Sequence, residues 1–89
     1  MYLHLGQDTV VRLDEIVGIF DIENASISRH TKRYLANAEQ HGRVVNVSTE
    51  LPKSFIVCEQ NRRVTVYISQ ISSQTLKKRA GFVQHLKLS

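Results

Sequence analysis

Two apolar runs in the middle of the chain predict the core of the fold. The run Ser54–Cys58 is continuously apolar after its first residue, which is typical of a strand covered on both faces. The run Val64–Ser69 is rich in β-branched and aromatic residues and predicts a second strand. Between them, Glu59–Arg63 contains an asparagine and paired arginines, and predicts a longer hairpin loop. We therefore expect a central hairpin over Pro52–Ser69 that is apolar in the middle and cationic at both ends.

Three short strands are predicted in the N-terminal part of the chain, before the first helix. Tyr2–Leu5 and Thr9–Leu13 flank the turn Gly6–Asp8 and predict an N-terminal hairpin. Ile16–Phe20 resumes the apolar pattern after two acidic residues and predicts a third strand. Gly18 within it indicates either a bulge or a close approach of another group to the backbone.

The segment Ser26–Gln40 has apolar residues at helical spacing and predicts the first helix. Its apolar stripe consists of Ile27, Thr31, Tyr34, Leu35 and Ala38. Either Ser26 or Ser28 can cap its start, and Gly42 stands where a helix end favours a positive φ. A fourth strand, Arg43–Ser48, is then predicted to lead into the central hairpin.

A second helix is predicted over Gln74–Gln84, after a cap at Ser72 or Ser73. Its apolar stripe consists of Leu76, Ala80 and Val83. Gly81 weakens this helix and can end it early. The residues from His85 onward are expected to form a frayed tail.

The predicted order β-β-β-α-β-β-β-α favours the α+β class, with a small, mostly antiparallel sheet and two helices packed on it. The 89 residues are expected to form a single domain over 1–89. A domain of this size buries only about 60% of the surface of its unfolded chain. Oligomerisation would add buried surface, so we expect a homo-oligomer.

Charge is divided unevenly along the chain. Residues 1–25 carry one arginine against five carboxylates, a balance of −4, whereas residues 26–89 carry eleven Lys and Arg against three carboxylates, a balance of +8. A basic surface attracts polyanions through counterion release. The acidic and basic parts could also attract one another between subunits. Both interpretations remain open at the level of the sequence.

The basic residues form clusters that are candidates for binding a polyanion. Arg29, Lys32 and Arg33 fall at i, i+3 and i+4, so their side chains converge on one helix face. Arg62 and Arg63 lie in the predicted hairpin loop, where paired guanidinium groups could reach a phosphate. An ordinary solvated surface explains each cluster about equally well.

A third cluster, Lys77–Arg79, spans three consecutive helical positions, and a solvated surface is favoured there. The sequence shows no pattern of an enzyme or a metal site. His30 and His41 are eleven residues apart, about three helical turns, which is too far for one metal. The single cysteine, Cys58, lies in a predicted core strand and is expected to pack as a small hydrophobe. We expect no catalytic activity, no cofactor and no metal.

The N-terminus shows no signal-peptide pattern, because Met1 leads directly into a short strand and a turn. No apolar run approaches the ~20 residues of a membrane span. We therefore expect a cytoplasmic protein without a membrane partner.

Several segments of the chain resemble a known family. They are Tyr2–Gly6, Val17–Asp21, Pro52–Ser54 and the run Ser69–Ala80. Together they resemble the bacterial extracellular-matrix regulators, the RemA/RemB family, over almost the whole chain. These motifs are not catalytic signatures, so the resemblance rests on the overall pattern.

The resemblance implies a DNA-binding regulator of biofilm-matrix genes in Gram-positive bacteria. A-type members of the family form rings of small β-rich subunits related to the LytTR type of DNA-binding fold. Their loop before the strand equivalent to Ser54–Cys58 carries adjacent arginines that contact DNA. Here that loop reads Glu50–Lys53, so only Lys53 remains, and another DNA-contacting arginine of those members corresponds to Glu15.

Two hypotheses follow. The first is a homo-oligomeric, ring-forming transcriptional regulator that binds duplex DNA and reads its shape more than its base edges. Its expected DNA-binding residues are Lys53, Arg62, Arg63, Arg29, Lys32 and Arg33. The alternative is a protein-interaction module that assembles with an A-type, DNA-binding relative, its acidic N-terminal third docking on a basic neighbour.

Overall fold

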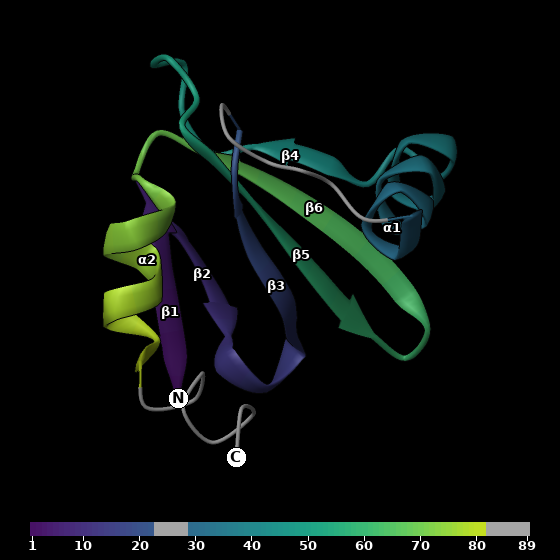
Figure 1. Cartoon of the computed structure of the whole chain (residues 1–89), viewed down its shortest axis with the longest axis horizontal. Helices are drawn as coiled ribbons and strands as arrows, with labels where there is room; N and C mark the ends of the chain where they lie inside the picture. Colours follow the sequence, from purple (N-terminus) through teal and green to yellow (C-terminus); the bar gives the residue numbers. More distant parts are fainter. Residues whose placement is uncertain (23–28, 82–89) are drawn as a thin grey trace.

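A four-stranded sheet forms the middle of the molecule in the computed structural model, which describes residues 1–22 and 29–81 (Figure 1). Its strands lie in the order β3 (Ile16–Asp21), β5 (Ser54–Gln60), β6 (Arg63–Ser69) and β4 (Val44–Asn46). The β3–β5 and β5–β6 pairs are antiparallel, whereas the β4–β6 pair is parallel. The prediction of a mostly antiparallel α+β fold is confirmed, with β4 as the parallel edge strand.

The loop between β5 and β6 is tighter than the sequence suggested. The ladder continues to the pair Gln60–Arg63, so only Asn61 and Arg62 form the turn, and the prediction of a five-residue loop is wrong. Both turn residues have positive φ, 51° and 66°. Two successive positive φ values are typical of turns whose twist matches that of the flanking strands. Polar composition therefore misled the prediction, because these polar residues continue the ladder outside the core.

A separate two-stranded sheet forms from β1 (Tyr2–Gly6) and β2 (Thr9–Arg12). The short 3-10 helix η1 (Leu13–Glu15) connects it to β3. Helix α2 (Ser73–Arg79) packs against β1 and β3. Its predicted cap is confirmed, since the backbone N–H of residue 75 donates to the hydroxyl of Ser72 at 3.2 Å.

The strand β5 is covered on both faces, as its continuous apolar run predicted. Ile56 and Cys58 belong to a core formed with the β1–β2 hairpin and α2. Phe55 and Val57 belong to a second core under α1 (Arg29–Gln40). Successive side chains of a strand point to opposite faces, which places these two cores on opposite sides of the sheet. The expected burial of the Cys58 thiol is confirmed.

Two glycines act as the sequence predicted. Gly42 has a φ of 68° and ends α1, where the N–H of Arg43 donates to the carbonyl of Ala38 at 2.8 Å. At Gly18 the β3–β5 register shifts, and a Cβ atom built there would lie 2.5 Å from the Phe20 ring. The expected bulge and the expected close approach therefore both occur at Gly18.

Some predictions on the helices lie outside the described residues. The caps at Ser26 and Ser28 and the stripe residue Ile27 precede the described part of α1. The end of α2 at Arg79 agrees with an early termination near Gly81. The predicted continuation from residue 82 to Gln84, Val83 and the tail from His85 are not among the described residues.

Candidate nucleic-acid interface

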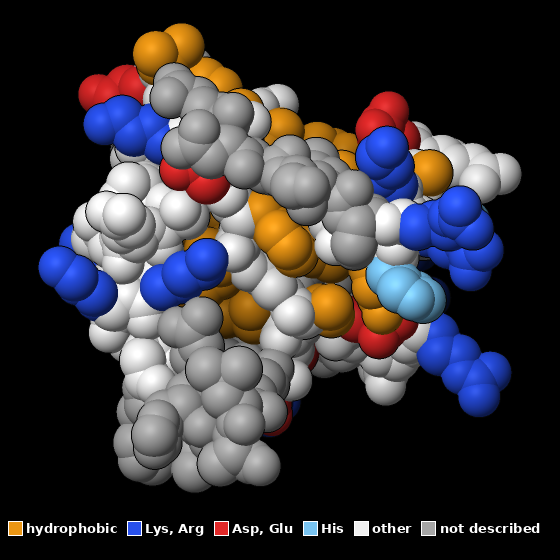
Figure 2. Space-filling model, viewed as in Figure 1, with side chains coloured by type: hydrophobic (Ala, Val, Ile, Leu, Met, Phe, Trp, Pro, Cys, Tyr) orange, Lys and Arg blue, Asp and Glu red, His pale blue; other side chains and the backbone are white. Residues whose placement is uncertain are grey.

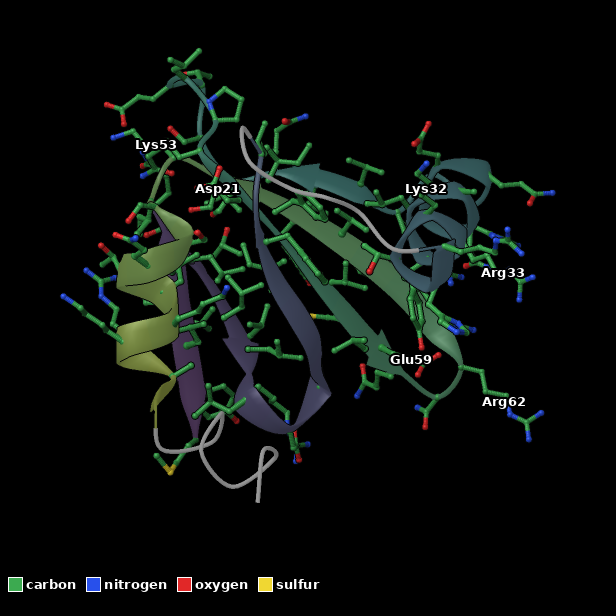
Figure 3. The ribbon with its side chains drawn as sticks, in the orientation of Figure 1. Asp21, Lys32, Arg33, Lys53, Glu59 and Arg62 are labelled. Carbon is green, nitrogen blue, oxygen red and sulfur yellow. The ribbon has the colours of Figure 1, made fainter. Side chains whose placement is uncertain are left out.

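Helix α1 and the β5–β6 turn bring cations from two distant parts of the chain to one end of the molecule (Figure 3). Arg33 from α1 and Arg62 from the turn line a common hollow of about 300 Å³. Arg29 lies one helical turn before Arg33. Lys32 is also exposed on α1, three residues after Arg29. We call these four residues, Arg29, Lys32, Arg33 and Arg62, the α1–turn patch.

The packing of α1 explains why these cations face solvent. Thr31 and Ala38 are buried on the side of the helix that meets the sheet, and Tyr34 and Leu35 pack against the core beneath it. The cations occupy the remaining sides of the helix. Val64, at the beginning of β6, belongs to the same core and lines the hollow, so the turn is held next to α1.

The charge of the α1–turn patch is only partly offset. Glu59 lines the hollow and lies between the helix and the turn, so the guanidinium groups of Arg33 and Arg62 share it with one carboxylate (Figure 3). Among the described residues, the ion pairs are those of Arg12 with Asp14 at 2.8 Å and with Glu15 at 3.9 Å. The hollow therefore keeps a net positive charge, which attracts a polyanion.

The other predicted contact residues lie elsewhere. Lys53 projects at the opposite end of the hairpin, beside Asp21 at the end of β3 (Figure 3). Arg63 pairs with Gln60 and lines a hollow on the sheet face away from α1. The cluster Lys77–Arg79 belongs to α2, across the molecule from α1 (Figure 1). Of the six residues predicted to bind DNA, the structure thus brings Arg33 and Arg62 to one hollow, with Arg29 and Lys32 on the same helix as Arg33, and it separates Lys53 and Arg63 from them.

The space-filling view shows the same division of charge (Figure 2). Cations gather at the right edge, over α1 and the turn, whereas apolar side chains are visible in the centre between α1 and the sheet. A hollow of about 680 Å³ lies there and is lined mainly by apolar residues, including Leu35, Phe55 and Ile68. Its apolar walls do not suit a charged backbone, so the α1–turn patch is the better candidate for a polyanion.

The hollow that Arg33 and Arg62 share also contains three polar residues that the sequence did not predict as part of a site: His30, Asn37 and Glu59. Asn37 follows Arg33 by four residues, so helical spacing could have placed it on the same face. Glu59 could not be found in this way, because its position next to α1 depends on how the hairpin packs. An amide and a carboxylate beside two guanidinium groups add hydrogen-bonding capacity to what would otherwise be a purely cationic surface.

The described residues contain neither a candidate metal site nor a candidate membrane span. Over 1–22 and 29–81, no group of three His, Cys, Asp or Glu residues could hold a metal ion. Within the same ranges, every helix is too short or too polar to cross a membrane.

Fold and site together define a small α+β protein with one strongly basic end. Residues 2–80 match the model of the RemA-like family, described as extracellular matrix regulatory protein A-like. The chain is 45% identical over 83 residues to Extracellular matrix regulatory protein B of Bacillus subtilis (strain 168), and the match covers 93% of this chain and 94% of that protein. The chain therefore belongs to the RemA-like family. The resemblance to the RemA/RemB family that the sequence showed is confirmed, and the relative from Bacillus subtilis is a B-type member, RemB.

Proposed function

We propose that this protein is a DNA-binding transcriptional regulator of extracellular-matrix genes in biofilm formation, and that it acts as a homo-oligomer. Membership of the RemA-like family and the 45% identity to a protein named as a matrix regulator support the regulatory role. The single observation that supports DNA binding is the convergence of α1 and the β5–β6 turn around one hollow.

The chemistry of the α1–turn patch suits a phosphate backbone. Arg33 and Arg62 each present a planar group of donors that can bind a phosphate through two hydrogen bonds. A protein that neutralises phosphates releases counterions, so its affinity falls steeply as salt rises. Three or four contacts per subunit give only weak binding. In an oligomer the later contacts become intramolecular, and the overall affinity rises by orders of magnitude.

The alternative, an assembly partner that docks through an acidic N-terminal third, receives less support. Arg12 lies 2.8 Å from Asp14 and 3.9 Å from Glu15, so two of the carboxylates counted in the sequence already have a cation within their own subunit. These contacts are exposed and therefore weak. They nevertheless reduce the negative charge that this region offers to a basic neighbour.

The test is fluorescence anisotropy with a labelled DNA duplex at about 50 mM and about 200 mM salt. We expect log K to fall against log salt with a slope of about −3 for each subunit engaged. The double variant R33Q/R62Q should bind about a hundredfold more weakly at low salt, because it loses two phosphate contacts. The matched control is K78Q/R79Q, which removes two exposed cations from α2 and should bind like the unmodified protein.

Two results would contradict the proposal. Absence of binding at low salt, or equal losses in R33Q/R62Q and K78Q/R79Q, would reject the α1–turn patch as a DNA interface. Light scattering tests assembly separately, and a mass near the 10.2 kDa of one chain would reject the homo-oligomer.

A further inference from the structure

A second basic hollow lies on the face of the four-stranded sheet opposite to α1. Its volume is about 240 Å³. We call it the Arg43–Arg63 cleft. Its polar lining consists of Glu15, Arg43, Gln60, Arg63, Thr65 and Tyr67. No local pattern in the sequence pairs Arg43 with Arg63, and the proposed DNA interface does not use this cleft.

The register of the sheet explains why these residues meet. Arg63, Thr65 and Tyr67 alternate along β6, so they share one face. Gln60 is the ladder partner of Arg63 on β5 and lies beside it. Arg43 immediately precedes β4, and its carbonyl accepts a hydrogen bond of 2.9 Å from the N–H at position 66. The parallel β4–β6 pairing therefore places a second guanidinium group at the same end of β6.

The two arginines are not neutralised by the described part of the protein. Neither Arg43 nor Arg63 forms an ion pair with a described residue, whereas Arg12 lies against Asp14 and near Glu15. Glu15 is the one carboxylate that lines the cleft. The two guanidinium groups repel each other in this small hollow. An anion bound between them would be attracted to both and would offset their repulsion.

Neutral donors complete the cleft. Burial raises the pKa of the Tyr67 phenol, and the nearby Cys58 and Glu15 raise it further. Tyr67 therefore keeps its proton at neutral pH and can donate a hydrogen bond. The hydroxyl of Thr65 and the amide of Gln60 can also donate. An acceptor-rich anion would thus find guanidinium, hydroxyl and amide donors within one hollow.

The size of the cleft limits the ligand. Pockets for drug-sized molecules have volumes of roughly 300–1,000 Å³, so a cleft of about 240 Å³ suits a phosphate group with a small organic part. We propose that the Arg43–Arg63 cleft binds a small phosphate-bearing molecule. Arg43 and Arg63 hold the phosphate, and Glu15 accepts a hydrogen bond from a hydroxyl or amine of the remainder. Because the cleft and the α1–turn patch lie on opposite faces of the sheet, the site does not depend on DNA binding.

Equilibrium dialysis of the full chain against radiolabelled inorganic phosphate tests this site, with chloride added to hold the ionic strength constant. Saturable binding is expected, with glycerol phosphate as a competitor. Arg43→Gln and Arg63→Gln should each weaken phosphate binding about tenfold or more, since each removes a charge-assisted contact. Arg63→Lys should fall between, because lysine keeps the charge and loses the paired donors. Glu15→Gln should strengthen the binding of inorganic phosphate, because it removes the opposing charge.

The variant K78Q/R79Q is the matched control, because it also removes two exposed cations, which line neither hollow, and should keep its phosphate affinity. Thermal unfolding without phosphate checks that every variant is folded. Absence of saturable binding, or equal binding by the protein and the Arg43 and Arg63 variants, would overturn the proposal. A loss of duplex affinity in those variants without phosphate binding would overturn it too and assign the cleft to the DNA surface. Phosphate binding that persists in a protein with no affinity for DNA would reject the proposed function and retain this one.

Discussion

The two ends of the β5–β6 hairpin both carry cations, but they are built differently. At the Lys53 end, Ser54 and Ser69 are fully buried, and their hydroxyls donate to the carbonyls of Ile71 at 2.7 Å and Leu5 at 2.6 Å. At the turn end, the backbone of Arg62 has a positive φ and its side chain projects into solvent. One end joins the hairpin to the rest of the molecule, and the other is exposed beside α1.

This difference explains why the loop Glu50–Lys53 and the α1–turn patch lie at opposite ends of the hairpin. The backbone of Lys53 is held by two hydrogen bonds. The N–H of Lys53 donates to the carbonyl of Ser69 at 2.9 Å, and the carbonyl of Lys53 accepts from the N–H of Ile22 at 3.1 Å. A single lysine on this segment has no cationic neighbour from its own hairpin end. The turn end combines arginines from two elements. The buried hydrogen bonds are therefore concentrated at one end of the hairpin and the clustered arginines at the other.

The largest expected effect is on stability, at the Lys53 end. Ser69→Ala removes a buried hydroxyl that donates to Leu5 and accepts from the N–H of Ile71 at 3.0 Å. The loss of two buried hydrogen bonds should lower the free energy of unfolding by about 2–3 kcal/mol. Chemical denaturation measures the loss, and the duplex affinity of the folded variant should be unchanged. A stability within about 0.5 kcal/mol of the original protein would show that this end is not the structural one.

The next largest effect is expected at Arg62, where one substitution should raise stability and lower duplex affinity. Arg62→Gly places the residue that best tolerates a positive φ in the turn, which should raise the free energy of unfolding by about 0.5–1 kcal/mol. The same change removes a phosphate contact and should weaken duplex binding about tenfold. Thermal unfolding and anisotropy report the two quantities on one sample. If stability and affinity fell together, the positive φ of Arg62 would not be a strained conformation kept for binding.

A smaller gain is expected at Glu59. Glu59→Gln removes the carboxylate from the hollow that Arg33 and Arg62 share. Duplex affinity should rise about twofold to threefold, because interactions between exposed charges are worth at most about 1 kcal/mol. Anisotropy at low salt measures the change, and Glu50→Gln, an exposed carboxylate in the loop before β5, serves as the control. A drop in affinity would instead make Glu59 a direct contact to the DNA.

The smallest effect is expected at Lys53. Lys53→Gln should weaken duplex binding less than about twofold, because an isolated exposed cation contributes little. The comparison is with Arg62→Gln in the same anisotropy assay. A larger loss at Lys53 than at Arg62 would make the loop Glu50–Lys53 the main DNA contact and reverse the assignment of the two ends.

Local patterns in the sequence were sufficient for most of the elements. The apolar run of β5 predicted a strand buried on both faces, Gly42 predicted the end of α1, and Ser72 predicted the cap of α2. Each of these signals depends on a residue and its near neighbours in the chain. Helical spacing alone likewise groups Arg29, Lys32 and Arg33 into one cluster, because residues three and four apart are neighbours on a helix surface.

Only the tertiary structure decided how the cations are grouped. Arg62 and Arg63 are adjacent in the sequence, yet one lines the hollow under α1 and the other lines the cleft on the opposite face. Arg43 joins Arg63 through the parallel β4–β6 pairing, which no local pattern indicated. The physical reason is that strand register and helix docking depend on contacts between distant segments, and a shift of one residue moves every side chain of a strand to the other face. The sequence determined which elements form and where charge occurs, and the packing determined which charges can act on the same ligand.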